Sequence, residues 1–289
     1  MVIGVNPTSY LIYRMTGIRP LGRPSIPAYV FKSVEPSFAP FREVFGKDLK
    51  VRESIRGAYM HGTVLDRASQ EMISLYQKKV GFDVDLEVGT FQTVSVEIEK
   101  DGWYQSGEIE YIKQSKEGTF LVKVKGEPEP RETEWIWSTV PLRVLMTLIG
   151  YKKNELDRVY IYRVKRDKRV GGWRDKRVGG WDGHSFDPKY ELVYDLDQDS
   201  IYSRHVRIGI PQKPSTVQWY SEIWSLSPIK EVENLVKFYT VPLRLNRKVK
   251  IPKGIELVGT YSEWDYRINM THVLEKVREL SKTYGIGSL

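Results

Sequence analysis

Hydrophobic residues recur at helical spacing in several stretches of the chain. Between Ser54 and Lys79, apolar side chains return at steps of three and four residues, which is the repeat of an α-helix with one buried face. Gly81 follows this stretch, as expected for a glycine that ends a helix. The same spacing predicts a helix over residues 268–284. Shorter helices are expected over 9–15, 135–149 and 228–239.

Alternation of apolar and polar residues predicts strands in the middle of the chain. Three such runs, 91–99, 103–113 and 119–125, follow one another with turn residues between them, which predicts an antiparallel meander. An apolar, β-branched run over 159–164 predicts a further strand. The order of helix, meander, helix and strand predicts an α/β fold, with a central mixed sheet flanked by helices. The C-terminal remainder, with short strands over 190–194 and 206–210, is expected to be a mixed α+β segment.

A segment of eight residues occurs twice in tandem. Arg166–Trp173 reads RDKRVGGW, and Arg174–Trp181 repeats it letter for letter. Two copies are too few for a solenoid, and the paired glycines favour a flexible loop or an exposed hairpin. We therefore expect three consecutive parts: a core over 1–165, a basic duplicated loop over 166–183, and the C-terminal segment over 184–289.

Composition narrows the classes of function. The 289 residues include no cysteine, which excludes disulfides, thiolate metal sites and iron–sulfur clusters. The four histidines do not lie at metal-ligand spacing. No apolar run approaches the length of a membrane span and no signal peptide is evident, so we expect a protein of the cytoplasm or of a virion. The formal net charge of +8 favours polyanionic partners.

Several segments, in order, resemble the RecB-type branch of the PD-(D/E)XK nucleases, and within it the nucleases of CRISPR spacer acquisition. Asn6–Tyr10 resembles the family's opening S-P-S, and Arg56–Gly62 resembles its G-x-x-x-H helix. Gly102–Glu110 resembles its G-w-x-l-x-G-x-x-D strand, and Leu121–Gly126 resembles its v-v-E-x-K strand. The helix from Pro141 to Gly150 resembles its Q-x-x-x-Y helix. The resemblance spans residues 6–164 and implies a restriction-endonuclease-like core.

The resemblance also implies a degenerate metal site at His61, Glu110, Lys123 and Lys125. Glu110 stands in the position of the family's aspartate, and Lys125 in that of its lysine. Lys123, however, replaces the second carboxylate that would bind Mg²⁺ or Mn²⁺, and a cation there repels a divalent ion. We therefore expect no catalytic residue, no metal and no cofactor. Lys123 would either pair with Glu110 in place of the metal or form a solvated cross-strand pair.

Two alternatives remain open at this point. His61 is either a metal ligand or a structural histidine. An active Mg²⁺- or Mn²⁺-dependent DNA nuclease would need a rearranged site built on His61 and Glu110, with a second carboxylate taken from Glu97, Glu99 or Glu127.

The duplicated loop is the first candidate for binding nucleic acid. Its cations can pair with phosphates, and its indoles can stack on bases. The alternative is an exposed hairpin that is held together by Arg–Asp ion pairs and binds no nucleic acid. The residues concerned are Arg166, Lys168, Arg169, Trp173, Arg174, Lys176, Arg177 and Trp181. The resemblance thus implies an inactive, nuclease-like protein that binds nucleic acid, with DNA as the leading candidate, and that resembles a nucleocapsid component of a virus of hyperthermophilic archaea. A scaffold that only binds other proteins is a further alternative, and an oligomer is allowed.

Overall fold

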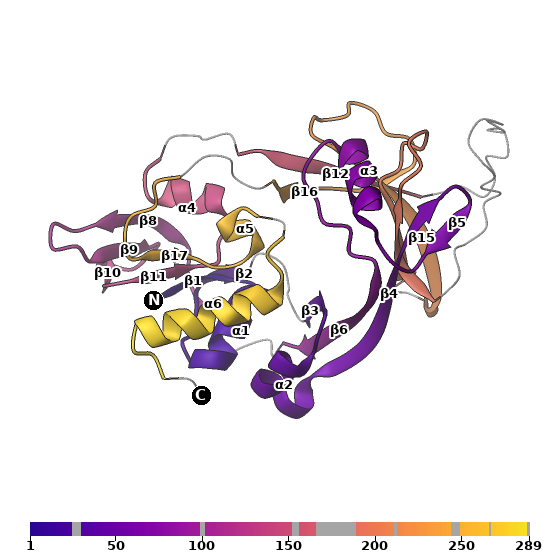
Figure 1. Cartoon of the computed structure of the whole chain (residues 1–289). Helices are drawn as coiled ribbons and strands as arrows, with labels where there is room; N and C mark the ends of the chain where they lie inside the picture. Colours follow the sequence, from indigo (N-terminus) through magenta and orange to yellow (C-terminus); the bar gives the residue numbers. More distant parts are fainter. Residues whose placement is uncertain are drawn as a thin grey trace. The chain divides into compact units, whose positions relative to one another are not determined.

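The computed structural model describes residues 1–24, 30–98, 102–151, 156–165, 189–210, 213–243, 249–265 and 267–287. The chain divides into two compact units, and Figure 1 labels most of their helices and strands. Unit 1 comprises Met1–Arg52, Gln92–Asp157 and Pro242–Leu289, and unit 2 comprises Glu53–Phe91 and Arg158–Val241. Unit 2 is therefore inserted into unit 1 at two places in the sequence. This division differs from the three consecutive parts expected from the duplicated loop.

Unit 1 is built around a parallel sheet. Its five strands lie in the order β17 (Ile255–Leu257), β11 (Ile136–Ser138), β1 (Val2–Val5), β2 (Leu21–Pro24) and β7 (Gln105–Ser106), and every neighbouring pair is parallel. The central strand β1 is buried along its whole length, as expected for a parallel strand covered on both faces. The connections between the parallel strands are long, and α1 forms the one between β1 and β2.

Two long helices pack together beside this sheet. The helix α1 (Pro7–Thr16) follows β1 directly. The last helix, α6 (Met270–Thr283), packs against α1. Both contribute to one hydrophobic core, which includes Leu11, Ile12, Val273 and Val277 from the two helices. The shorter helical elements of unit 1 are α2 (Ala39–Phe45), a 3-10 turn over Gly46–Asp48, α4 (Leu142–Leu148) and α5 (Thr260–Glu263).

A three-stranded antiparallel meander forms a second sheet in unit 1. Its strands are β8 (Ile109–Gln114), β9 (Phe120–Val124) and β10 (Arg131–Thr133), with β9 in the middle. Alternate residues of β9 point into a core that α4 covers, and Phe120, Val122 and Val124 are buried there. Unit 1 also contains β3 (Val30–Glu35), which pairs antiparallel with β6 (Gly89–Glu97).

Unit 2 is a mainly antiparallel sheet with one helix. Its strands lie in the order β16 (Leu235–Pro242), β12 (Arg158–Lys165), β15 (Lys213–Ser225), β14 (Arg204–Ile210), β13 (Tyr190–Asp195) and β4 (Lys50–Met60), and β5 (Thr63–Leu65) pairs with β4. The pair β13–β4 is parallel. The helix α3 (Gln70–Val80) packs its Tyr76 against Tyr194 of β13 and Trp224 of β15.

The structure confirms a mixed α/β fold but not the particular arrangement that the nuclease resemblance implies. The expected helices over 9–15 and 268–284 are present, as are strands within 119–125, 159–164 and 190–194. The meander is made of β8, β9 and β10, because the run over 91–99 pairs with β3 instead.

Three expected helices are wrong in whole or in part. Residues 54–69 form β4, β5 and the chain that leads into α3. His61 and Gly62, both with positive φ, make the tight turn between these strands. The range 135–149 begins as strand β11, and the range 228–239 contains the start of strand β16. In each case pairing within a sheet overrides a pattern that also fits a helix.

None of the described helices is both long enough and apolar enough to cross a membrane.

Candidate functional site

The turn between β1 and α1 is the first feature of the candidate site. Gly4 has a φ of 95°, and a Cβ at this position would lie 2.6 Å from Thr139 Oγ1 and 3.0 Å from the Val140 amide nitrogen. Both the backbone conformation and the close approach therefore require glycine here. The chain then passes through Val5 and enters α1 at Pro7, where the fixed φ of proline suits the first helical position.

Asn6 caps the start of α1 with its own side chain. Its Oδ1 accepts a hydrogen bond from the Ser9 backbone N–H at 3.1 Å, and Ser9 Oγ accepts one from the Asn6 N–H at 2.9 Å. The Asn6 Nδ2 donates to the carbonyl oxygen of Thr139 at 2.9 Å and so ties α1 to the chain that follows β11. Asn6 thus occupies the end of the helix that would otherwise attract an anion.

The loop after β17 lies beside the same turn. Gly259 has a φ of 97°, and a Cβ there would come within 3.0 Å of the Thr8 side chain. The Gly259 N–H donates to Glu263 Oε1 at 3.0 Å, and Lys276 of α6 donates to the other oxygen of that carboxylate at 2.8 Å. The carboxyl ends of β1, β11 and β17 therefore converge on one place, at the edge where open α/β sheets bind their ligands.

A buried carboxylate holds the start of α6. Glu35, at the end of β3, has no exposed surface. Its Oε1 accepts the Met270 N–H at 3.0 Å, and its Oε2 accepts the Thr271 hydroxyl at 2.7 Å. An anion at a helix N-terminus is favoured by the helix dipole, so Glu35 fixes α6 in place.

Unit 2 contains a buried charged cluster, which we call the Glu222 cluster. Glu222 of β15 is fully buried and accepts hydrogen bonds from Arg163, Arg204 and the Tyr239 hydroxyl, at 2.6–3.0 Å. Burial alone would raise the pKa of Glu222, but the two guanidinium groups and the tyrosine outweigh it and lower the pKa to about 2. The hydroxyl of Tyr76 is buried close to these charges and makes no hydrogen bond with a described residue.

A second buried network in unit 2 has the residue types of a hydrolytic triad. His205 lies between Ser221 Oγ, at 2.9 Å from Nδ1, and Asp195 Oδ2, at 3.1 Å from Nε2. Asp195 also binds Lys79 at 3.0 Å, and these partners together keep the pKa of its carboxyl below the usual value despite burial. Ser221 is 1% exposed, so no substrate reaches its hydroxyl. The network is structural rather than nucleophilic, since a triad needs an accessible serine.

The residues of the site that the nuclease resemblance implies belong to both units of the chain. His61 is an exposed turn residue of unit 2, whereas Glu110, Lys123 and Lys125 belong to the meander of unit 1. Lys123 lies opposite Tyr111 and donates to the backbone carbonyls of Glu127 and Pro128, so the hypothetical pair with Glu110 is not formed. Lys125 pairs with Glu108 at 3.5 Å.

The duplicated loop lies outside the described residues, and its role in binding nucleic acid stays a prediction. Among the residues that the structure describes, no group of three or more His, Asp or Glu side chains could hold a metal ion. No model of a known protein family matches the sequence, and no curated protein matches it.

The solved structures that are similar to this chain are enzymes other than nucleases. An oxidoreductase from Methanosarcina mazei is similar with a TM-score of 0.55 and 8% identity, over 97% of this chain and 99% of the other. A tryptophan halogenase from Shewanella frigidimarina has a TM-score of 0.51 and 8% identity, over 99% and 70% of the two chains. A reduced UDP-galactopyranose mutase has a TM-score of 0.50 and 10% identity, over 99% and 93%.

This likeness establishes the fold alone, a Rossmann-like α/β fold. It contradicts the interpretation as a PD-(D/E)XK nuclease, degenerate or active, and with it the functions inferred from that resemblance: DNA binding by a nuclease-like core, a CRISPR-associated role and a nucleocapsid role. The expectation of no cofactor, or of Mg²⁺ or Mn²⁺, rested on the nuclease resemblance and is contradicted together with it.

The residues from the end of β1 to the first turn of α1 fit a dinucleotide in part. The dinucleotide fingerprint G-x-G-x-x-G uses its first glycine for the tight turn, its second for close approach of the pyrophosphate, and its third for helix packing. Gly4 has the first role, but Asn6 and Ser9 stand at the second and third positions. Pro7 carries no N–H, and the Ser9 N–H is already bonded to Asn6. The Thr8 amide is the donor left at this end of α1 without a partner among the described residues.

Sequence reasoning missed this site although part of its signal is visible. A short apolar run, Val2–Val5, directly precedes the Gly-x-Asn-x-x-Ser segment and a helix, which is the context of a dinucleotide turn. Two of the three glycines are replaced, and Asn6–Tyr10 also resembles the opening motif of the nuclease family. The convergence of Thr139 and Gly259 on this turn carries no sequence signal, because these residues are far apart in the chain.

Proposed function

We propose that this protein is a flavin-dependent oxidoreductase that binds FAD weakly at the carboxyl edge of its parallel sheet. The supporting observation is the convergence of three strand ends with the N-terminus of α1, at the position where this architecture binds dinucleotides. The similarity to an oxidoreductase over almost the full length of both chains also supports the proposal. A bound flavin would supply hydride-transfer chemistry.

The chain offers some groups that suit an anionic dinucleotide. The Thr8 amide points out of the first turn of α1, where the helix dipole favours a phosphate. The formal net charge of +8 also attracts an anionic ligand from solution. Asn6, Pro7 and Thr8 are each partly exposed, so a ligand can reach this turn.

The replaced glycines should make the binding weak. Asn6 and Pro7 together remove two backbone donors that a three-glycine turn presents to the pyrophosphate. A hydrogen bond to a charged group contributes roughly 1.5–3 kcal/mol, and each 1.4 kcal/mol or so corresponds to a tenfold change in Kd. We therefore expect a dissociation constant on the order of micromolar rather than nanomolar, and a cofactor that exchanges with solution.

Titration of the purified protein with FAD, followed by calorimetry and flavin fluorescence, tests this proposal. Riboflavin, which lacks the diphosphate and adenosine, should bind more weakly than FAD. The variant Asn6→Gly should tighten FAD binding by about tenfold, because it opens the helix end to the pyrophosphate. Glycine costs an N-terminal cap only a few tenths of a kcal/mol, so the helix should remain folded.

Ser69→Gly is the matched control, because Ser69 caps α3 of unit 2 through the Met72 N–H in the same way. This variant should leave the affinity for FAD unchanged. The proposal is overturned if neither the wild type nor Asn6→Gly shows saturable binding of FAD at millimolar concentration, while both remain folded by circular dichroism.

A further inference from the structure

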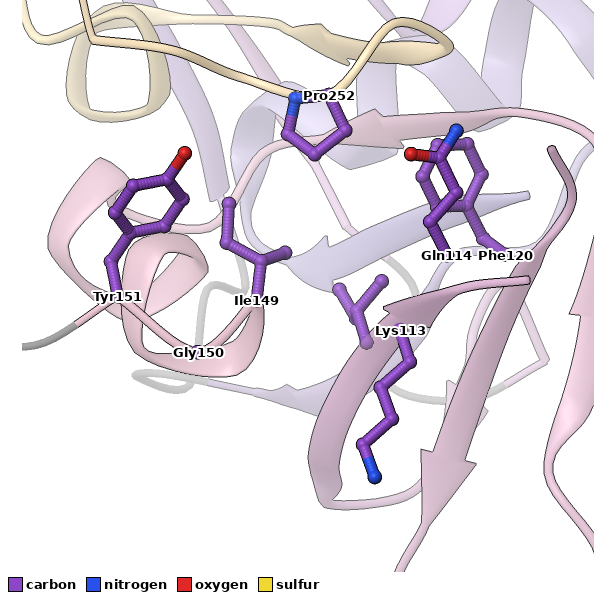
Figure 2. A pocket seen from close by; sticks show the side chains of 8 residues that line it. Lys113, Gln114, Phe120, Ile149, Gly150, Tyr151 and Pro252 are labelled. Atoms are coloured by element: carbon purple, nitrogen blue, oxygen red, sulfur yellow. The ribbon is translucent and has the colours of Figure 1, made fainter. Parts of the chain in front are cut away.

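A cleft opens at the end of the meander in unit 1. Gln114 and Phe120 line one side of it, and Ile149 and Tyr151 line another (Figure 2). Lys113 supplies the single charge among the lining residues, and its side chain points away from the others in Figure 2. A ligand site needs polar groups that converge on the ligand, so we assign no ligand to this cleft.

The strand β16 forms an open edge of the sheet in unit 2. It pairs with β12 on one side, and no strand in the described part of the chain pairs with its other side. Leu235, Val236 and Phe238 of this strand are 46%, 52% and 49% exposed. Large apolar side chains that stand half exposed on an open strand edge are a template for pairing with a further strand.

Both faces of the sheet are apolar at this edge, because side chains alternate along a strand. Tyr239 faces the buried charges, since its hydroxyl donates to the Glu222 carboxylate at 2.7 Å. Phe238 lies on the other face, where its ring centroid is 5.1 Å and 6.3 Å from those of two tyrosines of β12. Leu235 therefore shares the face of Tyr239, and Val236 shares the face of Phe238.

The edge carries little of the protection that open strands usually have. Exposed strand edges are commonly blocked by charged side chains, by prolines or by bulges. Lys237 is the single charged residue of β16, and Pro242 stands at its last position. The strand thus presents a largely uncharged, apolar edge, which is typical of a strand that is covered in an assembly.

The sequence of β16 is complementary to a second copy of itself. A two-fold axis between antiparallel strands places one residue opposite itself and pairs its neighbours in order. With the axis at Phe238, Val236 lies opposite Thr240, and Leu235 lies opposite Val241. Aromatic and β-branched pairs of this kind stabilise neighbouring strands.

Charge favours this register over the neighbouring one. With the axis at Phe238, Lys237 of one copy lies opposite Tyr239 of the other, and an ammonium group is attracted to an aromatic ring. Within one chain the Lys237 ammonium already lies 5.6 Å from the centre of the Tyr239 ring. An axis at Lys237 would instead bring two ammonium groups opposite each other, which is destabilising.

We propose that this protein forms a symmetric dimer, in which β16 of one copy pairs antiparallel with β16 of a second copy about a two-fold axis at Phe238. The pairing joins the two antiparallel sheets and covers the exposed side chains of Leu235, Val236 and Phe238 in both copies. The same strand edge is used on both sides, so the contact closes at two copies and does not propagate into a filament. The dimer does not depend on whether the turn at Asn6 binds FAD.

Sedimentation velocity of the purified full chain tests this proposal. We expect a dimer in the micromolar range. Phe238→Glu should raise the dissociation constant of the dimer by about tenfold or more, because it places two like charges at the axis. Ile201→Glu is the matched control, since Ile201 is 69% exposed in the loop between β13 and β14, and it should leave the dimer intact. Circular dichroism verifies that both variants are folded.

The chain has no cysteine, which allows a second measurement by cross-linking. Opposite residues of an antiparallel pair have Cα atoms about 4.5–5.5 Å apart, within the span of roughly 4.4–6.8 Å that a disulfide bridges. Under mild oxidation, Phe238→Cys should therefore form a covalent dimer roughly tenfold faster than Ile201→Cys.

Three outcomes would each overturn the proposal. The first is a wild type that sediments as a monomer throughout the micromolar range, which would leave this edge to a strand from a different protein. The second is a folded Phe238→Glu variant that dimerises as tightly as the wild type. The third is a Phe238→Cys variant that cross-links no faster than Ile201→Cys.

Discussion

The Glu222 cluster provides the most stringent test of the energetics of unit 2. Replacing Glu222 by Gln keeps the shape of the side chain but removes the only anion that Arg163 and Arg204 are seen to bind in the described part of unit 2. Both cations are then left partly buried without a counter-charge. Removing one partner of a buried ion pair lowers the free energy of unfolding by about 3–5 kcal/mol, because the remaining charge stays buried without its hydration. We expect a loss of this size in the free energy of unfolding of unit 2 at pH 7.

The lowered pKa of Glu222 makes this stabilisation depend on pH. Burial opposes ionisation, but the arginines and Tyr239 lower the pKa from 4.5 to about 2 in the folded protein. A difference of this size between the folded and unfolded states corresponds to roughly 3 kcal/mol. Because the folded pKa is the lower one, this stabilisation is complete above pH 4.5 and is lost as the pH falls toward 2.

Urea unfolding of the wild type and of Glu222→Gln, followed by circular dichroism between pH 7 and pH 2.5, measures both effects. The difference between the two proteins should be largest at pH 7 and should narrow below pH 4.5. Glu231→Gln, at an exposed position of unit 2, is the matched control and should change the free energy by less than about 0.5 kcal/mol. A Glu222→Gln protein as stable as this control at pH 7 would refute the reasoning.

Three further outcomes follow from buried contacts. Ser221 should resist labelling by a fluorophosphonate, read by intact mass, and Ser221→Ala should cost about 1–3 kcal/mol in urea because its buried histidine partner loses a hydrogen bond. Glu35→Ala should lower the free energy of unfolding of unit 1 by about 3 kcal/mol, whereas Glu43→Ala, which removes an exposed ion pair to the same helix, should cost under about 1 kcal/mol. Gly4→Ala should lower the melting temperature, measured by calorimetry, because its Cβ meets Thr139; an unchanged melting temperature would contradict the close packing.

Local signals in the sequence were sufficient for the elements with strong periodicity. Residues 268–284 carry an apolar stripe at helical spacing, and α6 occupies nearly that range. The alternation over 119–125 gives β9. Gly81 ends α3 in the left-handed conformation, as expected for a C-terminal glycine. These features depend on residues within a few positions of one another, so the sequence alone contains the necessary information.

The wrong elements share one physical cause. Residues 54–65 have spacing that fits a helix, but they form β4 and β5, because Tyr59 and Ala58 find strand partners in β13 and β5. The pattern over 228–239 likewise gives way to β16, which begins after Asn234 in a left-handed conformation. Strand partners come from distant parts of the chain, and a single sequence does not identify them.

By itself the sequence determined a mixed α/β protein with a basic charge and no cysteine chemistry, together with the approximate positions of its most regular helices and strands. Tertiary structure decided that the strands form a parallel sheet in one unit and an antiparallel sheet in the other, and that Asn6, Thr139 and Gly259 meet at one edge. It also decided which charges are buried together, as Glu222 shows. The physical reason is that periodicity reports only the burial of one face of an element, whereas a site depends on which faces and ends of distant elements come together.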